Sequence, residues 1–351
     1  MHSTVETIQF SLPEHLSCPK PTELRNIERD QVRLLVTSNK AEARHSQFYE
    51  LPEYLQPGDV LVVNTSATRA SAFPIDLLNG RKGMVHLSTQ LNHKEWLAEI
   101  REIRDNNTIR WKEGHEGLLY ELPGGGFLRL KQRFYENREL LNLWVIELEL
   151  KQNFDQYSAR HARPIQYENL LNSYPLEYYQ TLFSFHPGSS EMPSAARGFT
   201  PALVDRLLKK GIVFAPILLH TGVSSLEENE SPYPEYAEVS PISAAMINQA
   251  KRAGKRIVAV GTTAVRAVES ATNPSGEVLP YSGHTELYIE SGYEMKAINA
   301  LLTGFHEPRA SHLHMLQSLA GMEHIGKAYR LALEHDYFWH QFGDLHLILT
   351  K

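Results

Sequence analysis

Residues 254–270 read "GKRIVAVGTTAVRAVES" and bring two hydroxyl side chains to a structural junction. The apolar run at 256–260 predicts a β-strand, and the residues after Thr263 have the composition of a helix. Gly261, Thr262 and Thr263 stand between them. A helix that begins directly after a strand presents free N–H groups, which suit an anionic or polar ligand. The alternative is structural: the glycine makes the turn and a threonine caps the helix.

Two other predicted strands also end in polar residues. The run at 60–63 is followed by Asn64, and the run at 212–219 is followed by His220, a threonine and a glycine. Ligands of open α/β sheets lie outside the carboxyl ends of the strands. Three polar strand ends therefore favour one shared ligand site.

Arg266 lies one turn into the predicted helix, where its guanidinium group could bind a carboxylate through two hydrogen bonds. The structural alternative is a contact within the helix, to Glu269 three residues later or Ser270 four residues later. The residues alone do not separate these interpretations.

Three further side chains could transfer protons or bind a ligand. Glu286, in "HTELYI", is either a base or ribose ligand, or a charge at a strand edge that faces water. His306 is a candidate pocket residue, and His220 is either a proton donor or a packed, hydrogen-bonded histidine. His312 and His314 lie near His306, but no cysteine or HExxH spacing accompanies them, so we expect no metal site.

The composition limits the classes of protein. The 351 residues, 42% hydrophobic and 22% charged, suffice for one large domain or two ordinary domains. A formal charge of −6 excludes a global positive field for nucleic acid, so an RNA partner would need a local basic patch. The single cysteine, Cys18, permits no intramolecular disulfide. With no apparent leader and no apolar run of about 18 residues, we expect a cytoplasmic protein without a membrane span.

The pattern of elements changes twice along the chain. Short β-like runs between Gly, Asn and Pro turns at 70–150 predict a small β-barrel or sandwich. Beyond 155, predicted helices alternate with strands at 212–219, 256–260 and 286–289. The predicted helices are 201–210, 241–253, 263–271, 309–320 and 324–335.

This pattern predicts an α/β domain with an inserted small β-barrel domain. The discontinuous α/β domain comprises 1–69 and 153–351, and the insert comprises 70–152.

Five segments, in order along nearly the whole chain, resemble the S-adenosylmethionine:tRNA ribosyltransferase-isomerases of queuosine biosynthesis. They are "LQPGDVLVVN" (55–64), "YQTLFSFHPGS" (179–189), "GKRIVAVGTTAVRAVES" (254–270), "GYEMKAINALLTGFHEPRASHLHMLQSLAG" (292–321) and "AYRLALEHDYFWHQFGDLHLIL" (328–349). The resemblance implies a β-barrel inserted into an α/β domain. It also implies transfer and isomerisation of the ribosyl group of S-adenosylmethionine onto 7-aminomethyl-7-deazaguanine in tRNA. The products are epoxyqueuosine, adenine and methionine, and no metal or second cofactor is implied.

This reaction needs a general base, donors for the ribose and methionine groups, and help for the departing adenine. We expect Glu286, His306 and His220 to be the catalytic candidates. The expected S-adenosylmethionine ligands are Asn64, Gly261, Thr262, Thr263 and Arg266.

The loops depart from the family pattern where the acceptor would bind. The chain has "NTSATRA" where the family has Asn-Asp-Thr-Arg, and "PSAARGFT" at 193–200 lacks a family histidine. We expect the displaced Arg69 and the new Arg197 to contact the acceptor RNA. The acid-rich 222–240 segment also lacks a family arginine, so tRNA binding is in doubt. The alternatives are an S-adenosylmethionine-using paralogue with a different or no acceptor, and a non-catalytic protein that binds a nucleoside or RNA.

Overall fold

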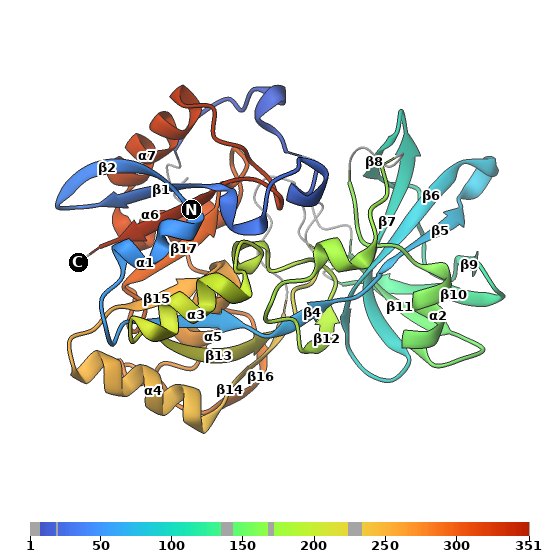
Figure 1. Cartoon of the computed structure of the whole chain (residues 1–351). Helices are drawn as coiled ribbons and strands as arrows, with labels where there is room; N and C mark the ends of the chain where they lie inside the picture. Colours follow the sequence, from blue (N-terminus) through green and yellow to red (C-terminus); the bar gives the residue numbers. More distant parts are fainter. Residues whose placement is uncertain (1–7, 19, 135–142, 168–171, 224–233, 351) are drawn as a thin grey trace.

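The computed structural model describes residues 8–18, 20–134, 143–167, 172–223 and 234–350. Figure 1 shows two lobes, one built on a large sheet flanked by helices and one built on a smaller, curled sheet. Segments from both ends of the chain form the first lobe, and the middle of the chain forms the second.

The large sheet has nine strands. In spatial order they are β16 (Tyr281–Thr285), β14 (Glu235–Val239), β13 (Val213–Leu219), β3 (Val60–Asn64), β15 (Ile257–Val260), β17 (Ala300–Gly304), β18 (Leu345–Leu349), β1 (Arg33–Ser38) and β2 (Ala41–Gln47). β13, β3, β15 and β17 are parallel neighbours, and β18 is antiparallel to β17 but parallel to β1. The carboxyl ends of β13, β3 and β15 therefore meet at one edge, as predicted.

Helices cover both faces of this sheet, which is why its central strands β3 and β15 are almost uniformly apolar and buried. The helices are α1 (Leu51–Tyr54), α3 (Pro201–Lys209), α4 (Pro241–Arg252), α5 (Thr262–Ser270), α6 (His312–Ala320) and α7 (Met322–Glu334). Residues of α4 to α7 form one core with the sheet, and residues of α1 and α3 form another on the opposite face.

The second sheet has seven strands, all antiparallel to their neighbours. They are β5 (Ala72–Asp76), β6 (Lys82–Gln90), β7 (Glu95–Arg104), β8 (Asn107–Arg110), β9 (Leu119–Leu122), β10 (Gly126–Arg133) and β11 (Leu143–Glu149). The strands at the two ends of the main path, β5 and β9, lie close together, so the sheet curls into a nearly closed barrel. Its interior is apolar and includes Phe73, Trp111 and Trp144.

Short elements complete the fold. The 3-10 helices are η1 (Glu14–Leu16), η2 (Thr22–Leu24), η3 (Arg29–Gln31), η4 (Phe48–Glu50), η5 (Leu78–Gly80), η6 (Leu176–Tyr179) and η7 (Ser194–Ala196). A parallel ribbon of β4 (Ser66–Thr68) and β12 (His186–Ser189) lies between the two lobes (Figure 1). The helix α2 (Phe154–His161) packs on the barrel, because Phe154 and Tyr157 contact its core.

The sequence predicts most of these elements. The strands predicted at 212–219 and 256–260 and the helices of the α/β part are confirmed to within a few residues. The strand predicted at 286–289 is wrong, because β16 ends at Thr285. Its polar sequence "YSGHT" forms the strand by pairing with β14 at the edge of the sheet. The predicted domain boundaries at 69/70 and 152/153 stay predictions, and the packing groups α2 with the barrel.

Asn64 holds the carboxyl edge of the sheet together. Its side-chain amide donates to the carbonyl of Leu219 at 2.8 Å and to the hydroxyl of Thr263 at 3.4 Å. Its side-chain oxygen accepts from the N–H groups of Ser66 at 3.1 Å and Leu219 at 3.0 Å. The side chain is completely buried, so these bonds fix the end of β3 against β13 and the start of α5.

We predict that Asn64→Ala lowers the free energy of unfolding by about 2–4 kcal/mol, because buried donors and acceptors lose their partners. Urea unfolding followed by circular dichroism measures the change. Asn172→Ala, at an exposed asparagine, is the control and is expected to stay within about 0.5 kcal/mol of the parent. Equal stability of the two variants would show that the Asn64 bonds do not hold this edge.

Candidate functional site

A cavity of about 370 Å³ opens at the carboxyl ends of β15 and β17. This volume lies in the range of roughly 300–1,000 Å³ that small-molecule sites occupy. The α/β lobe supplies most of the wall, including 261–263 and 303–307. The chain that leaves the barrel lobe supplies 164–167.

The junction between β15 and α5 forms part of this wall. Gly261 has a φ of +91°, a backbone conformation that favours glycine, and makes the turn from strand to helix. Thr262 and Thr263 form the first turn of α5 and line the cavity, and no side chain in the described part of the chain caps this helix. The threonine cap of the structural alternative is therefore not formed, and the helix N-terminus is at the cavity, where it suits an anionic or polar group.

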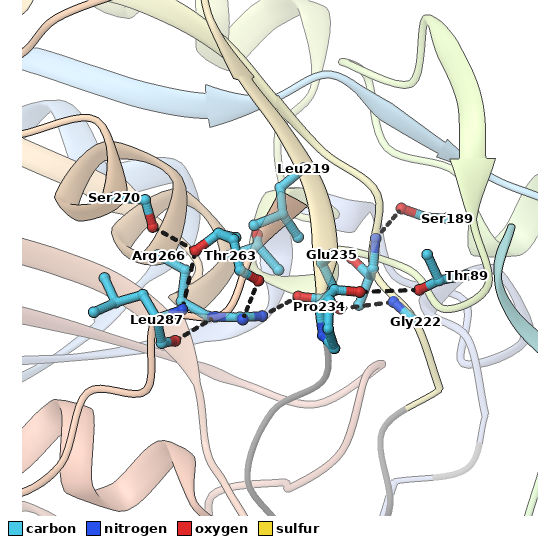
Figure 2. Close-up of polar contacts among 12 residues, drawn as sticks. Thr89, Ser189, Leu219, Gly222, Pro234, Glu235, Thr263, Arg266, Ser270 and Leu287 are labelled. Carbon is cyan, nitrogen blue, oxygen red and sulfur yellow. Dashed lines mark hydrogen bonds and ion pairs between the residues drawn. The ribbon is translucent and has the colours of Figure 1, made fainter. Parts of the chain in front are cut away.

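Arg266 reaches the cavity but is held by the protein (Figure 2). Its guanidinium group pairs with the carboxylate of Glu235 on β14 and donates to the carbonyls of Leu287 at 3.0 Å and Thr285 at 3.2 Å. Glu235 also accepts from the N–H of Gly222 at 2.7 Å. Arg266 therefore bonds to β14, to the last residue of β16 and to the chain after β16. The sequence predicted Glu269 or Ser270, within the helix, as its partner.

Burial sets the electrostatics of this ion pair. Burial raises the pKa of the Glu235 carboxyl above its ordinary value, while Arg266 and the N–H of Gly222 lower it in part. Both side chains are almost inaccessible to solvent, so removal of either one would leave a buried charge without compensation.

His306 and His312 form a stacked pair at the cavity, with ring centroids 4.6 Å apart and planes inclined by 7°. The Nε2 of His306 is hydrogen-bonded to the hydroxyl of Thr303 at 2.9 Å, and its backbone N–H donates to the hydroxyl of Tyr329 at 3.1 Å. β17 thus holds the ring of His306, and α7 holds its backbone.

Both imidazoles of this pair are neutral at pH 7. Burial and, to a smaller extent, the charge of Arg266 together lower the pKa of His312 to about 4. Burial also lowers the pKa of His306 well below its ordinary value, with a further contribution from His312. A neutral imidazole carries a lone pair, so each ring can accept a proton from a bound ligand.

The wall contributed from the barrel side contains a carboxylate held by a phenol. The Tyr167 hydroxyl donates to Glu191 Oε1 at 2.7 Å, and both residues line the cavity. Burial raises the pKa of Tyr167 well above its ordinary value, and the carboxylates of Glu191 and Glu99 raise it further, so the phenol keeps its proton. The Arg101 guanidinium lies 4.8 Å from the Tyr167 ring centroid and supports the ring from β7.

The structure does not bring every predicted site residue to the cavity. Gly261, Thr262, Thr263, Arg266 and His306 line it.

Asn64 is buried outside the lining residues and is hydrogen-bonded to the lining residue Thr263. Glu286 is exposed just after β16 and is not among the lining residues, although its neighbour Leu287 is.

His220 also lies outside the cavity wall. Its Nδ1 is hydrogen-bonded to the Ser66 hydroxyl at 2.8 Å, and its ring stacks on Tyr236. Burial lowers the pKa of His220 to about 4. This environment fits the alternative of a packed, hydrogen-bonded histidine.

The structure corrects the expectation for Arg197. Its guanidinium group is buried and bonds to the Tyr178 carbonyl at 3.0 Å, the Thr22 hydroxyl at 3.0 Å and Glu23 at 2.6 Å. Arg197 is thereby engaged inside the protein, where RNA phosphates do not reach it. Arg69 keeps 24% of its side chain exposed, beside Asp155 at 3.7 Å. The acidic residues Glu227, Glu228 and Glu230 lie outside the described residues.

Sequence reasoning missed His312, Tyr167 and Glu191 as cavity residues. His312 was considered only as a metal ligand, yet its spacing from His306, across a Pro-containing turn into a helix, allows the two rings to stack. Tyr167 and Glu191 carry no local signal, because the packing of the two lobes brings them together. Within the described ranges, no group of three metal-binding side chains occurs. No described helix is both long and apolar enough to cross a membrane.

The fold and the cavity define a two-lobed protein with a small-molecule site at the carboxyl edge of an α/β sheet and a barrel-like sheet beside it. Comparison with known proteins identifies the family. The family profile described as "Queuosine biosynthesis protein" matches residues 5–348, and the chain belongs to this family. The sequence-based family resemblance is thereby confirmed.

Relatives match over nearly their whole length. The S-adenosylmethionine:tRNA ribosyltransferase-isomerase of Desulforamulus reducens is 32% identical, covering 97% of this chain and 98% of the relative. The S-adenosylmethionine:tRNA ribosyltransferase-isomerase of Moorella thermoacetica is 34% identical, covering 98% of this chain and 99% of the relative. The crystal structure of S-adenosylmethionine tRNA ribosyltransferase from Thermotoga maritima is similar with a TM-score of 0.54 and 28% identity, covering 97% of this chain and 99% of that chain.

We predict that Arg266→Ala lowers the free energy of unfolding by about 3–5 kcal/mol, because it leaves Glu235 buried without its counter-charge. Arg266→Leu combined with Glu235→Leu is expected to recover part of this loss. Lys327→Ala is the control, because it breaks an exposed ion pair with Glu323 on α7 and should cost about 0.5 kcal/mol or less. Urea unfolding at pH 7 compares the variants, and similar losses for Arg266→Ala and Lys327→Ala would contradict a structural role for the buried pair.

A second prediction concerns pH. Because His312 has a folded pKa of about 4 and an ordinary value of 6.5, the unfolded chain binds its proton first as pH falls through this window. Stability is therefore lost between about pH 6.5 and pH 4. His312→Gln is expected to reduce the loss between pH 7 and pH 5 by about 1–2 kcal/mol. The exposed His93→Gln is the control, and an unchanged pH slope in both variants would contradict the buried, neutral state of His312.

Proposed function

We propose that this protein catalyses the reaction for which its relatives are named. The ribosyl group of S-adenosylmethionine is transferred to 7-aminomethyl-7-deazaguanine in tRNA and isomerised, giving epoxyqueuosine with release of adenine and methionine. The observation that carries the proposal is the cavity itself, which joins a helix N-terminus to a neutral histidine pair. The reaction on tRNA implies a cytoplasmic enzyme.

The strand-to-helix junction serves S-adenosylmethionine. The N–H groups and hydroxyls of Thr262 and Thr263 offer donors for its carboxylate or ribose hydroxyls. Arg266 adds a positive charge to the same wall while its position is fixed by Glu235. Asn64 is a positioning residue, because it holds the Thr263 hydroxyl from beneath.

The histidine pair serves the proton transfers. One proton must leave the carbon beside the sulfonium sulfur, the acceptor amine must lose a proton as it attacks the anomeric carbon, and adenine must gain one as it leaves. A neutral imidazole has a lone pair that can take up a proton, and its lowered pKa makes the protonated ring a strong acid that returns the proton to a leaving group. His312 is our candidate for the base, because it lines the cavity next to the fixed ring of His306.

Glu286 and His220 have weaker places in this scheme. Glu286 would need a movement of the chain after β16 to reach a ligand, because it is exposed outside the wall. His220 is held by Ser66 and Tyr236 away from the wall. We therefore assign the proton transfers to His306 and His312 and retain no direct role for Glu286 or His220.

The two arginines expected at the acceptor differ in their exposure. Arg197 is withdrawn from RNA contact, but Arg69 remains partly exposed beside the cavity residue Thr68. An assay of both products, adenine and modified tRNA, distinguishes the two sequence-based alternatives. An S-adenosylmethionine-using paralogue would release adenine without modifying tRNA, whereas a non-catalytic protein would do neither.

We expect the purified protein, incubated with S-adenosylmethionine and tRNA carrying 7-aminomethyl-7-deazaguanine, to form epoxyqueuosine and adenine. Mass spectrometry of the digested RNA and chromatography of the small molecules measure both products. His312→Ala and His306→Ala are each expected to lower kcat by about 10²–10⁴, the usual contribution of a positioned acid or base.

The exposed His284→Ala on β16 is the control and should retain the parental kcat. Binding of S-adenosylmethionine to the histidine variants, measured by calorimetry, separates lost chemistry from lost folding. Parental kcat in His312→Ala would remove this residue from the mechanism. Absence of modified tRNA with the parent protein would overturn the proposed function.

A further inference from the structure

Phe185 is a large apolar side chain in water. Its residue is 67% exposed, although it precedes β12 on the ribbon between the two lobes. The segment around it, "YQTLFSFHPGS", belongs to the family resemblance but contributes nothing through Phe185 to the core or to the cavity. The exposed ring of Phe185 therefore presents an apolar face that a partner could cover.

The backbone beneath this ring is fixed. The N–H groups of Phe185 and His186 both donate to the carbonyl of Thr65, each at 3.0 Å. β12 then pairs in parallel with β4, with His186 opposite Ser66. The ring therefore projects from a rigid ribbon, which reduces the entropy lost when a partner binds.

Polar and aromatic groups support the same ribbon. Behind it, the Ser66 hydroxyl bonds to the Ser189 hydroxyl at 2.6 Å and to His220 at 2.8 Å. A Cβ at Gly188 would lie 2.2 Å from the His220 ring, so the ribbon and this packed histidine are in close contact. His186, the residue after Phe185, is also exposed.

The ribbon leads directly into the cavity wall. Thr68, at the end of β4, and Ser190, immediately after β12, both line the cavity. Arg69 follows Thr68, and its backbone N–H donates to the carbonyl of Ser189 at 2.8 Å. An exposed aromatic ring, an imidazole and a partly exposed guanidinium thus lie along one ribbon that ends at the site.

Unpaired RNA bases stack on aromatic side chains, and cationic side chains bind the adjoining phosphates. We propose that Phe185 is a stacking platform for an unpaired nucleotide that neighbours the nucleotide entering the cavity. The inference rests on the proposed function, which requires one nucleotide of a tRNA loop to enter this cavity. In this proposal, the β4–β12 ribbon recognises the RNA next to the reacting base.

The test is Phe185→Ala, assayed with saturating S-adenosylmethionine and varied tRNA carrying 7-aminomethyl-7-deazaguanine at constant salt. Loss of one stacking contact is expected to raise the KM for tRNA about 5- to 100-fold. The KM for S-adenosylmethionine is expected to stay unchanged. Phe185→Trp should restore the parental KM for tRNA, because an aromatic face suffices.

Ile242→Ala is the matched control. Ile242 on α4 is 68% exposed and lies outside both the ribbon and the cavity wall, so its replacement should change neither KM. A KM for tRNA within twofold of the parent in Phe185→Ala would overturn the platform. Equal changes in both substrates' KM values would also overturn it, because they would indicate a structural role or another partner for this surface. Failure of the proposed function would appear separately, as absence of modified tRNA with the parent protein.

Discussion

The buried ion pair between Arg266 and Glu235 is the interaction on which the cavity wall depends. It joins α5 to β14, and its remaining hydrogen bonds add Gly222, Thr285 and Leu287 (Figure 2). These residues come from segments far apart in the chain. Without the pair, these segments would leave a buried charge or an unsatisfied carbonyl at the cavity. Burying the two charges costs desolvation free energy, but their bonds hold the segments of the wall together.

The low polarity of this region also determines its chemistry. Burial keeps the imidazoles of His306 and His312 neutral, and the neighbouring guanidinium of Arg266 opposes protonation of His312. Burial thus accounts both for the desolvation cost of the ion pair and for the neutral state of the two imidazoles. A site more open to water would let the histidines protonate nearer to neutral pH.

The two lobes contribute different parts of the site. The α/β sheet supplies the strand ends and the helix N-terminus, and the chain leaving the barrel supplies Tyr167, which holds Glu191. The β4–β12 ribbon lies between the lobes (Figure 1). In our proposals, the strand ends and helix N-terminus of the α/β sheet bind S-adenosylmethionine, and the ribbon binds RNA. One cavity thus serves a small molecule and a nucleic acid.

The sequence by itself determined most of the elements and the family. The apolar runs before Asn64, His220 and Gly261 predict three strands that end at one edge, because buried parallel strands need continuous apolar residues. The Gly-Thr-Thr junction likewise predicts a helix N-terminus there. These features are local, since they depend on residues adjacent in the chain.

Only the tertiary structure decided which polar groups meet. Arg266 pairs with Glu235, 31 residues away, whereas the sequence offered only partners within the helix. Arg197 is buried against Thr22 and Glu23. From the sequence alone, an arginine in a loop is expected to be exposed to solvent. His220 and His306 both looked like candidates, and packing placed only His306 at the cavity. The physical reason is that burial and ion pairing depend on contacts between distant segments, which the periodicity and local composition of a sequence do not encode.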